Sequence, residues 1–114
     1  MGHKLPLLIG FESIICSTPE FDVEKIPKML DGAKDFLRKL HGLKYYEIIL
    51  YSPRNADKIW HWLKRNDIAK YVDRIANERE NALIYLDWQN LNFNGDYNLA
   101  YNKIQNFLYF RQIF

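Results

Sequence analysis

The sequence lacks what disulfide-bonded, zinc-binding and membrane-spanning proteins need. Its single cysteine, Cys16, excludes a disulfide within the chain and fits a reducing compartment. The three histidines show no ligand spacing with the cysteine or with acidic residues, which argues against a zinc site. No apolar run approaches the roughly 20 residues of a membrane-spanning helix, and no signal peptide is visible. We therefore expect an intracellular, cytoplasmic protein with no membrane partner.

The charge shows no strong excess of either sign. Sixteen Lys and Arg residues are balanced by 14 Asp and Glu residues, for a formal net charge of +2. This balance argues against a nucleic-acid-binding module, in which basic residues usually form a marked excess. What the chain does have is an apolar fraction of 48% and an aromatic fraction of 16%, typical of a folded protein. Its 114 residues suit a single domain, 1–114, with one core.

Short apolar runs alternate with helix-like patterns along the chain. Strands are expected at residues 4–9, 45–51, 74–76 and 82–87, and the continuous apolar character of the first is typical of parallel sheets buried on both faces. Strands that alternate with helices predict βαβ units with right-handed crossovers. The expected fold is an α/β, Rossmann-like three-layer sandwich, in which a mostly parallel sheet is flanked by helices.

Capping residues and apolar stripes define the expected helices. Asp31 is the expected N-cap of the first helix, and Gly42 is its expected end. Asn55 is expected to cap the second helix, and Asp96 the last one, which we expect to run to about Tyr109. The second helix has an expected inner stripe, with Trp62 on its flank: Ala56, Ile59, Trp60 and Leu63.

Polar residues follow three of the expected strands. In parallel sheets of this kind, ligands bind beyond the carboxyl ends of the strands. This rule brings together residues 10–13, residues 52–55 and the pair Asp87-Trp88. The sequence therefore predicts a candidate site at this edge of the sheet.

These segments resemble the motifs of the haloacid dehalogenase (HAD) superfamily of phosphohydrolases, in the small form that lacks the inserted cap domain. The similarity runs from about residue 5 to residue 108. It includes the stretches STPEFD after the first strand, ILYSPRN at the second, IYLD at the fourth, and FNGDYN before the last helix. The resemblance implies a HAD-like fold over 1–114 with no cap insertion.

In that family, the first strand leads into Asp-x-Asp-Gly-Thr. The first Asp attacks phosphorus, and the second acts as general acid and base. On this sequence the nucleophile falls on Gly10 and the acid/base on Glu12, while Ser13 and Ile14 stand for the Gly and Thr. Because glycine has no side chain with which to attack, the resemblance implies a degenerate site whose covalent step is lost.

The other motifs lie closer to the family pattern. Ser52 matches the Ser or Thr that binds the phosphoryl group, Arg79 is the nearest match to the conserved cation, and Arg54 is a second candidate. Together with Asn55 at the start of the second helix, these residues are the phosphate-binding candidates. Ser52 has a second interpretation as a cap for the turn into that helix, which we favour.

The magnesium ligands of the family are only partly present. Asp87 matches the first of two acids in the fourth motif, and Trp88 replaces the second. Mg²⁺ prefers several oxygen ligands, so a retained ion would depend on Asp87 and Glu12, and otherwise no cofactor is expected. Glu12 is either a residual acid/base or a partner of Arg54 or Arg79. We expect the ion pair, because acid/base catalysis has little to assist without a nucleophile.

Because the resemblance implies a HAD-like protein whose site is degenerate, it predicts that the protein acts through protein–protein contacts, as a scaffold, structural or regulatory subunit. Its partner would be another protein or a second copy of the chain. A weak or atypical Mg-dependent phosphohydrolase and a non-hydrolytic phosphate binder are the alternatives. The Asn-, Lys-, Ile- and Tyr-rich composition suits the AT-rich genome of a bacterium or phage, and a phage protein of this kind could be virion-associated. Aromatic residues are the candidate anchors for a partner: Trp62, Trp88, Phe110 and Phe114. Each has a second interpretation: Trp62 as a residue at the edge of the core, Trp88 as a plug of the pocket, and the two terminal Phe residues as a cover for the edge of the sheet.

Overall fold

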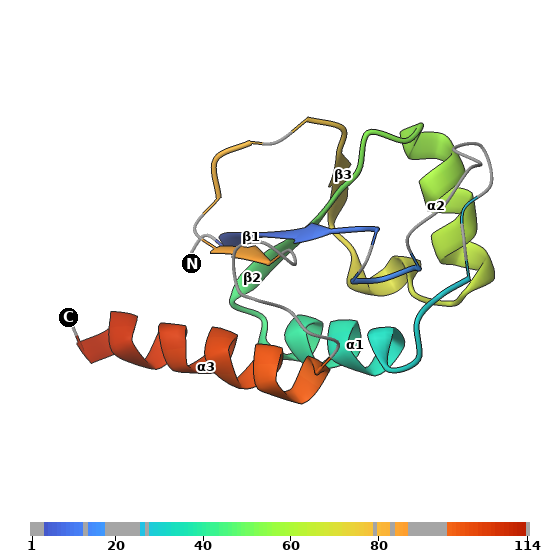
Figure 1. Cartoon of the computed structure of the whole chain (residues 1–114). Coiled ribbons are helices and arrows are strands. Elements are labelled where there is room, and N and C mark those ends of the chain that lie inside the picture. Colours follow the sequence, from blue (N-terminus) through green and yellow to red (C-terminus); the bar gives the residue numbers. More distant parts are fainter. Residues whose placement is uncertain are drawn as a thin grey trace.

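The computed structural model describes residues 4–12, 14–17, 26, 28–78, 80–82, 84–86 and 96–113, with side chains in the last segment described up to residue 106. One sheet has the strand order β3-β2-β1-β4, and all of its strand pairs are parallel. The expected α/β, Rossmann-like class with a parallel sheet is therefore confirmed (Figure 1). The strands are β1 (Leu5–Gly10), β2 (Tyr46–Tyr51), β3 (Arg74–Ala76) and β4 (Ile84–Leu86).

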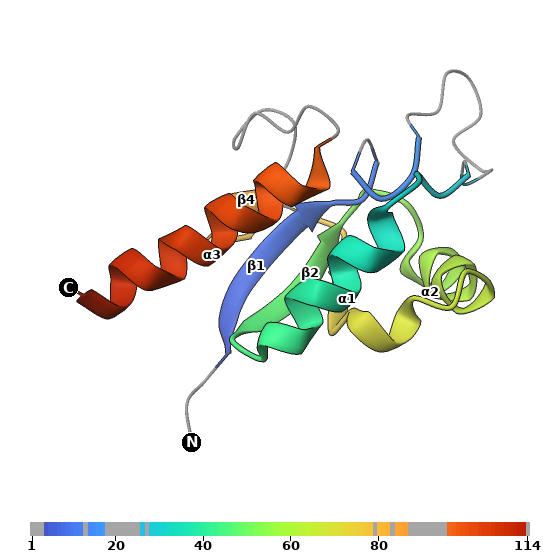
Figure 2. The same cartoon turned by 90° about the horizontal axis from the view of Figure 1, so that it is seen from below.

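The helices follow the expected order along the chain. They are α1 (Ala33–Leu43), α2 (Ala56–Arg65), the short 3₁₀ helix η1 (Ala69–Tyr71) and α3 (Tyr97–Ile113). Seen from below, α1 and α3 lie in front of the sheet, and α2 lies at the end of the molecule farthest from α3 (Figure 2). None of these helices is both long enough and apolar enough, over the described residues, to cross a membrane.

The two faces of the sheet are covered differently. Alternate side chains of a strand point to opposite faces, and Leu7, Ile9, Ile48 and Leu50 join the main core together with buried residues of α1, α2 and α3. On the opposite face, the described residues form a smaller cluster around Leu8, Ile49 and Ala76, packed against Tyr51, Ala82 and Tyr85.

The β3–β4 connection explains this difference. Only seven residues, 77–83, join Ala76 to Ile84, whereas parallel crossovers usually take a dozen or more and include a helix. Its described part runs on the side of the sheet opposite α1 and α3 (Figure 1). Among the described residues, the helices therefore form one layer and this connection covers the other face, so the third layer of the expected sandwich is not helical.

The expected ends of α1 were wrong. Gly32, not Asp31, is the N-cap, with a left-handed φ of 90°, and no side chain caps this end. Gly42 lies inside the helix, which ends where Lys44 adopts a left-handed φ of 62° and donates its backbone N–H to the carbonyl of His41. Gly32 is required by packing, because a Cβ there would lie 2.9 Å from the ring of Tyr97.

The expected caps of the other two helices are confirmed. The Oδ1 of Asn55 accepts a hydrogen bond from the backbone N–H of Lys58 at 3.2 Å. The Oδ1 of Asp96 accepts one from the backbone N–H of Leu99 at 3.0 Å. Helix α3 continues to Ile113, four residues beyond the expected end. Each cap satisfies a backbone donor that the first turn of a helix leaves without a partner.

Trp62 is a core residue, which agrees with its second interpretation rather than with a role as an anchor for a partner. The buried stripe of α2 consists of Ile59, Trp62 and Leu63, whereas Trp60 is only half-buried. The ring of Trp62 meets that of Phe11 edge-on, with centroids 5.1 Å apart, and the residue is 4% exposed. Helix α2 therefore directs Trp62 into the main core beside Phe11, whereas Trp60 packs at the margin of this core.

Candidate functional site

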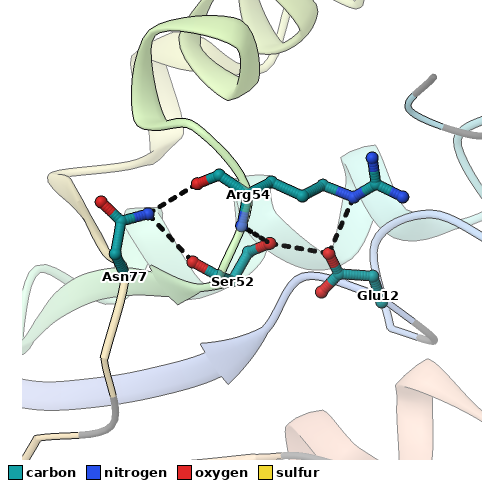
Figure 3. A network of polar contacts seen from close by, with 4 residues as sticks. All are labelled: Glu12, Ser52, Arg54 and Asn77. Atoms are coloured by element: carbon teal, nitrogen blue, oxygen red, sulfur yellow. Dashed lines mark hydrogen bonds and ion pairs between the residues drawn. The ribbon is translucent and has the colours of Figure 1, made fainter. Parts of the chain in front are cut away.

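The carboxyl ends of β1, β2 and β3 bring the candidate residues together. Gly10 pairs with Tyr51, and Tyr51 pairs with Ala76, so the three strands end side by side. Backbone bonds extend the ladder by one residue, from Phe11 N–H to the Tyr51 carbonyl and from Ser52 N–H to the Ala76 carbonyl. Glu12, Ser52 and Asn77 therefore lie at one edge of the sheet (Figure 3).

A carboxylate, a hydroxyl and a guanidinium form the centre of this edge. The Ser52 hydroxyl donates to Glu12 Oε1 at 2.6 Å and accepts from the backbone N–H of Arg54 at 3.1 Å. Arg54 Nε donates to the same Glu12 oxygen at 3.0 Å. The sequence left Glu12 with Arg54 or Arg79 as a partner, and the structure shows the pair with Arg54 (Figure 3).

Burial strengthens this ion pair. The side chains of Arg54 and Glu12 are 9% and 24% exposed, and Ser52 is fully buried. Charges that are largely withdrawn from water interact more strongly than surface charges and are screened less by salt. The Ser52 hydroxyl has one hydrogen-bond donor, which it donates to Glu12. Because Ser52 is also buried, its oxygen is not accessible from solvent as a nucleophile.

Asn77 is the member of this network that the sequence did not suggest. Its Nδ2 donates to the backbone carbonyls of Ser52 at 3.0 Å and Arg54 at 2.6 Å. The residue directly follows β3, so the rule that polar residues after parallel strands meet at one edge could have identified it. Asn77 fixes the backbone of the turn that presents Ser52 and Arg54 to Glu12 (Figure 3).

Cys16 lies beside this network and is a buried residue of the main core. Its pKa is raised from 9.0 to about 12, mainly by burial and also by the nearby Glu12 carboxylate, while Arg54 acts in the opposite direction. The thiol is therefore protonated at neutral pH. Because the thiolate is the reactive form, Cys16 supplies no nucleophile.

The start of α2 already uses its polar groups internally. The Ser52 hydroxyl accepts a hydrogen bond from the backbone N–H of Arg54, and the Oδ1 of Asn55 accepts one from the backbone N–H of Lys58. Asp57 adds a carboxylate in the first turn, where negative charge complements the helix dipole. A phosphate would have to compete with these groups, so Ser52 and Asn55 act as caps, the interpretation that the sequence favours for both.

The described part of the site does not fit a magnesium ion. Gly10 contributes no side chain, and the carboxylate of Glu12 is engaged by Arg54 and Ser52. Within the ranges that the structure describes, no group of three or more His, Cys, Asp and Glu residues could hold a metal. Mg²⁺ needs near-octahedral oxygen coordination, and one paired carboxylate does not provide it.

Several expected site residues lie outside the described residues. These include Arg79, Asp87, Trp88 and Phe114, while Phe110 belongs to α3 but its side chain is not described. Their proposed roles as phosphate ligand, metal ligand or anchors for a partner stay predictions. The described site therefore consists of Gly10, Glu12, Ser52, Arg54 and Asn77.

The comparisons with known proteins show a shared fold. No family model matches the chain, and no curated protein matches it. Among solved structures, the chain is similar to one described as the structure of a conserved protein from Bacteroides thetaiotaomicron. The TM-score is 0.70 with 16% sequence identity, and the match covers 91% of this chain and 92% of that chain. Because function depends on the site and not on the fold, this similarity assigns no activity.

Proposed function

We propose that this chain is a catalytically inactive relative of the HAD phosphohydrolases, which works by binding another protein. The observation that carries the proposal is the ion pair of Glu12 and Arg54 at the end of β1 and β2. The carboxylate that would serve as acid/base holds the guanidinium and the hydroxyl that would bind a phosphoryl group. The groups that would act on a substrate satisfy one another instead.

The position two residues before Glu12 supports the same proposal. Gly10 lies at the end of β1, where the family resemblance places the attacking carboxylate, and glycine offers no nucleophile. Among the described residues of the site, the hydroxyl of Ser52 and the nearby thiol of Cys16 are both buried. A domain of this fold that has no reacting group can still act by binding a partner through its surface.

A phosphatase assay tests the loss of catalysis. We expect no turnover of p-nitrophenyl phosphate in the presence of Mg²⁺ by the purified protein. The variant Gly10→Asp should remain inactive, because Glu12 stays bound to Arg54 and Ser52. Turnover that is lost in Glu12→Ala and kept in the matched variant Glu47→Ala, at a surface pair outside the site, would contradict the proposal.

The binding half of the proposal has its own test. Chemical cross-linking in the native source, followed by purification and mass spectrometry, should give a defined complex with another protein or with a second copy. Tandem purification without cross-linking should recover the same partner at a fixed stoichiometry. Recovery of the chain without any stoichiometric partner would argue against a binding role.

A further inference from the structure

The exposed side of α2 carries a group of basic residues that we call the basic face of α2: Lys58, His61, Lys64 and Arg65. All four residues are exposed. They lie on the side opposite the buried stripe of Ile59, Trp62 and Leu63, which packs into the main core. The helix has ten residues and a length of about 15 Å, so these side chains project from one short surface.

The basic face of α2 lacks the acidic partners that the basic residues of α1 have. On α1, Lys34 pairs with Asp67, and Arg38 and Lys39 pair with Asp35. Lys70 and Arg74 are likewise paired with acids. Among the described residues, no salt bridge or hydrogen bond engages the side chain of any of the four residues of the basic face, although the backbone N–H of Lys58 bonds the Asn55 cap. Asp57 is the only acid on the helix.

Position makes this face available to a partner. Helix α2 lies at the end of the molecule away from α3, and both views show its outer side pointing away from the sheet (Figures 1 and 2). The inner side is fixed by the edge-on contact of Trp62 with Phe11 and by the Asn55 cap. The basic side chains therefore stand on a rigid support, which lowers the entropic cost of binding.

We propose that the basic face of α2 binds an acidic segment of a partner protein. This inference rests on the proposed function, because it names the chemistry of the partner. Complementary charge is the argument: three Lys and Arg side chains without acids of their own gain most from carboxylates that lie opposite them. A nucleic acid fits less well, because the whole chain carries a net charge of only +2, whereas nucleic-acid-binding surfaces draw on a larger excess of basic residues.

A peptide-binding experiment tests this inference. The probe is a fluorescent 12-residue poly-glutamate peptide, and its binding to the full chain is followed by anisotropy in low and high salt. The test variant carries Lys58→Gln, Lys64→Gln and Arg65→Gln, which keep helix propensity and remove three charges. We expect at least 10-fold weaker binding by this variant, and similar weakening of the wild type in 0.5 M salt.

A matched control distinguishes an effect of the basic face from an effect of the lower net charge of the whole chain. The variant Lys4→Gln, Lys28→Gln and Lys44→Gln loses the same three charges at exposed lysines outside α2, and it should bind within twofold of wild type. Circular dichroism checks the folding of both variants. If the triple variant on α2 does not fold, the double variant Lys58→Gln and Arg65→Gln replaces it, with an expected loss of about fivefold.

Three outcomes would overturn the inference: no binding of the peptide by the wild type, equal weakening in the control variant, or tighter binding of a 12-nucleotide oligothymidylate than of the peptide. The phosphatase assay does not involve this surface. A failed peptide experiment without phosphatase turnover therefore removes this inference alone, whereas turnover contradicts the proposed function whatever the peptide does.

Discussion

At the scale of single residues, Glu12 joins parts of the chain that are 40 and 42 positions apart. We expect Glu12→Ala to lower the free energy of unfolding by about 1–3 kcal/mol, because the buried hydroxyl of Ser52 and the Nε of Arg54 lose their acceptor. Urea unfolding measures this loss. The control Glu47→Ala affects an exposed pair with Arg74 and should cost less than about 1 kcal/mol. Equal losses in the two variants would contradict the structural role of Glu12.

The buried thiol of Cys16 predicts a pH dependence. In the unfolded chain the thiol ionises near pH 9, whereas in the folded protein its pKa is about 12. The folded state therefore holds the proton longer, and this contribution to stability is complete below pH 9 and declines as the pH rises toward 12. We expect the free energy of unfolding to fall over this range, and Cys16→Ala to make the fall shallower.

Thiol chemistry gives an independent measurement at pH 8. The folded protein should react with an aromatic disulfide reagent at least about 100-fold more slowly than the urea-unfolded chain, since the thiolate is the reacting form. Equal rates in the two states would show that the thiol is accessible and ionised, against its position in the core.

At the scale of elements, we expect alanine substitutions at the two glycines of the α1 region, the N-cap Gly32 and the helical Gly42, to change stability in opposite directions. Gly32→Ala should destabilise the protein by about 1–2 kcal/mol or more, because φ is +90° and the new Cβ would lie 2.9 Å from the Tyr97 ring. Gly42→Ala should stabilise it by about 0.5–1 kcal/mol, because alanine favours the helix. Apart from the adjacent residues and the backbone of α1 itself, no atom lies within 4 Å of the new methyl group. Thermal and urea unfolding of the pair measure both signs. Stabilisation by Gly32→Ala would contradict the close packing of α1 against α3.

At the scale of the whole molecule, the sheet has one face under helices and one under a short connection. Two hydrogen bonds to the Tyr85 hydroxyl hold this connection: the hydroxyl donates to the Glu80 carbonyl at 2.7 Å and accepts from the Ala82 N–H at 2.9 Å. Arg74 also pairs with Glu80. The central strands, in contrast, are paired on both sides.

This arrangement predicts uneven protection against hydrogen exchange. In Tyr85→Phe, the Ala82 amide should exchange about 5- to 10-fold faster, because a lost hydrogen bond is worth about 1 kcal/mol and opening of this connection becomes easier. Amides of β2 should keep their rates. Tyr45→Phe, at a residue that is 50% exposed, is the control and should change neither. Unchanged exchange at Ala82 in Tyr85→Phe would show that other contacts hold the connection.

The sequence by itself determined the features that depend on near neighbours along the chain. Apolar runs and helical spacing gave the α/β class and the positions of the four strands to within two residues at either end. Asn55 and Asp96 were identifiable as caps because a cap bonds a backbone group only three residues away. Gly10 was identifiable as a position without a nucleophile because this follows from residue type alone.

Only the tertiary structure decided the features that depend on segments far apart in the chain. Gly32 is needed because Tyr97 packs against it from α3, and Trp62 is buried because Phe11 lies beside it. The choice of Arg54 as partner of Glu12, and the presence of Asn77 behind the turn, follow from strands that end side by side. Burial and distance between such segments are set by packing, which local sequence patterns do not encode.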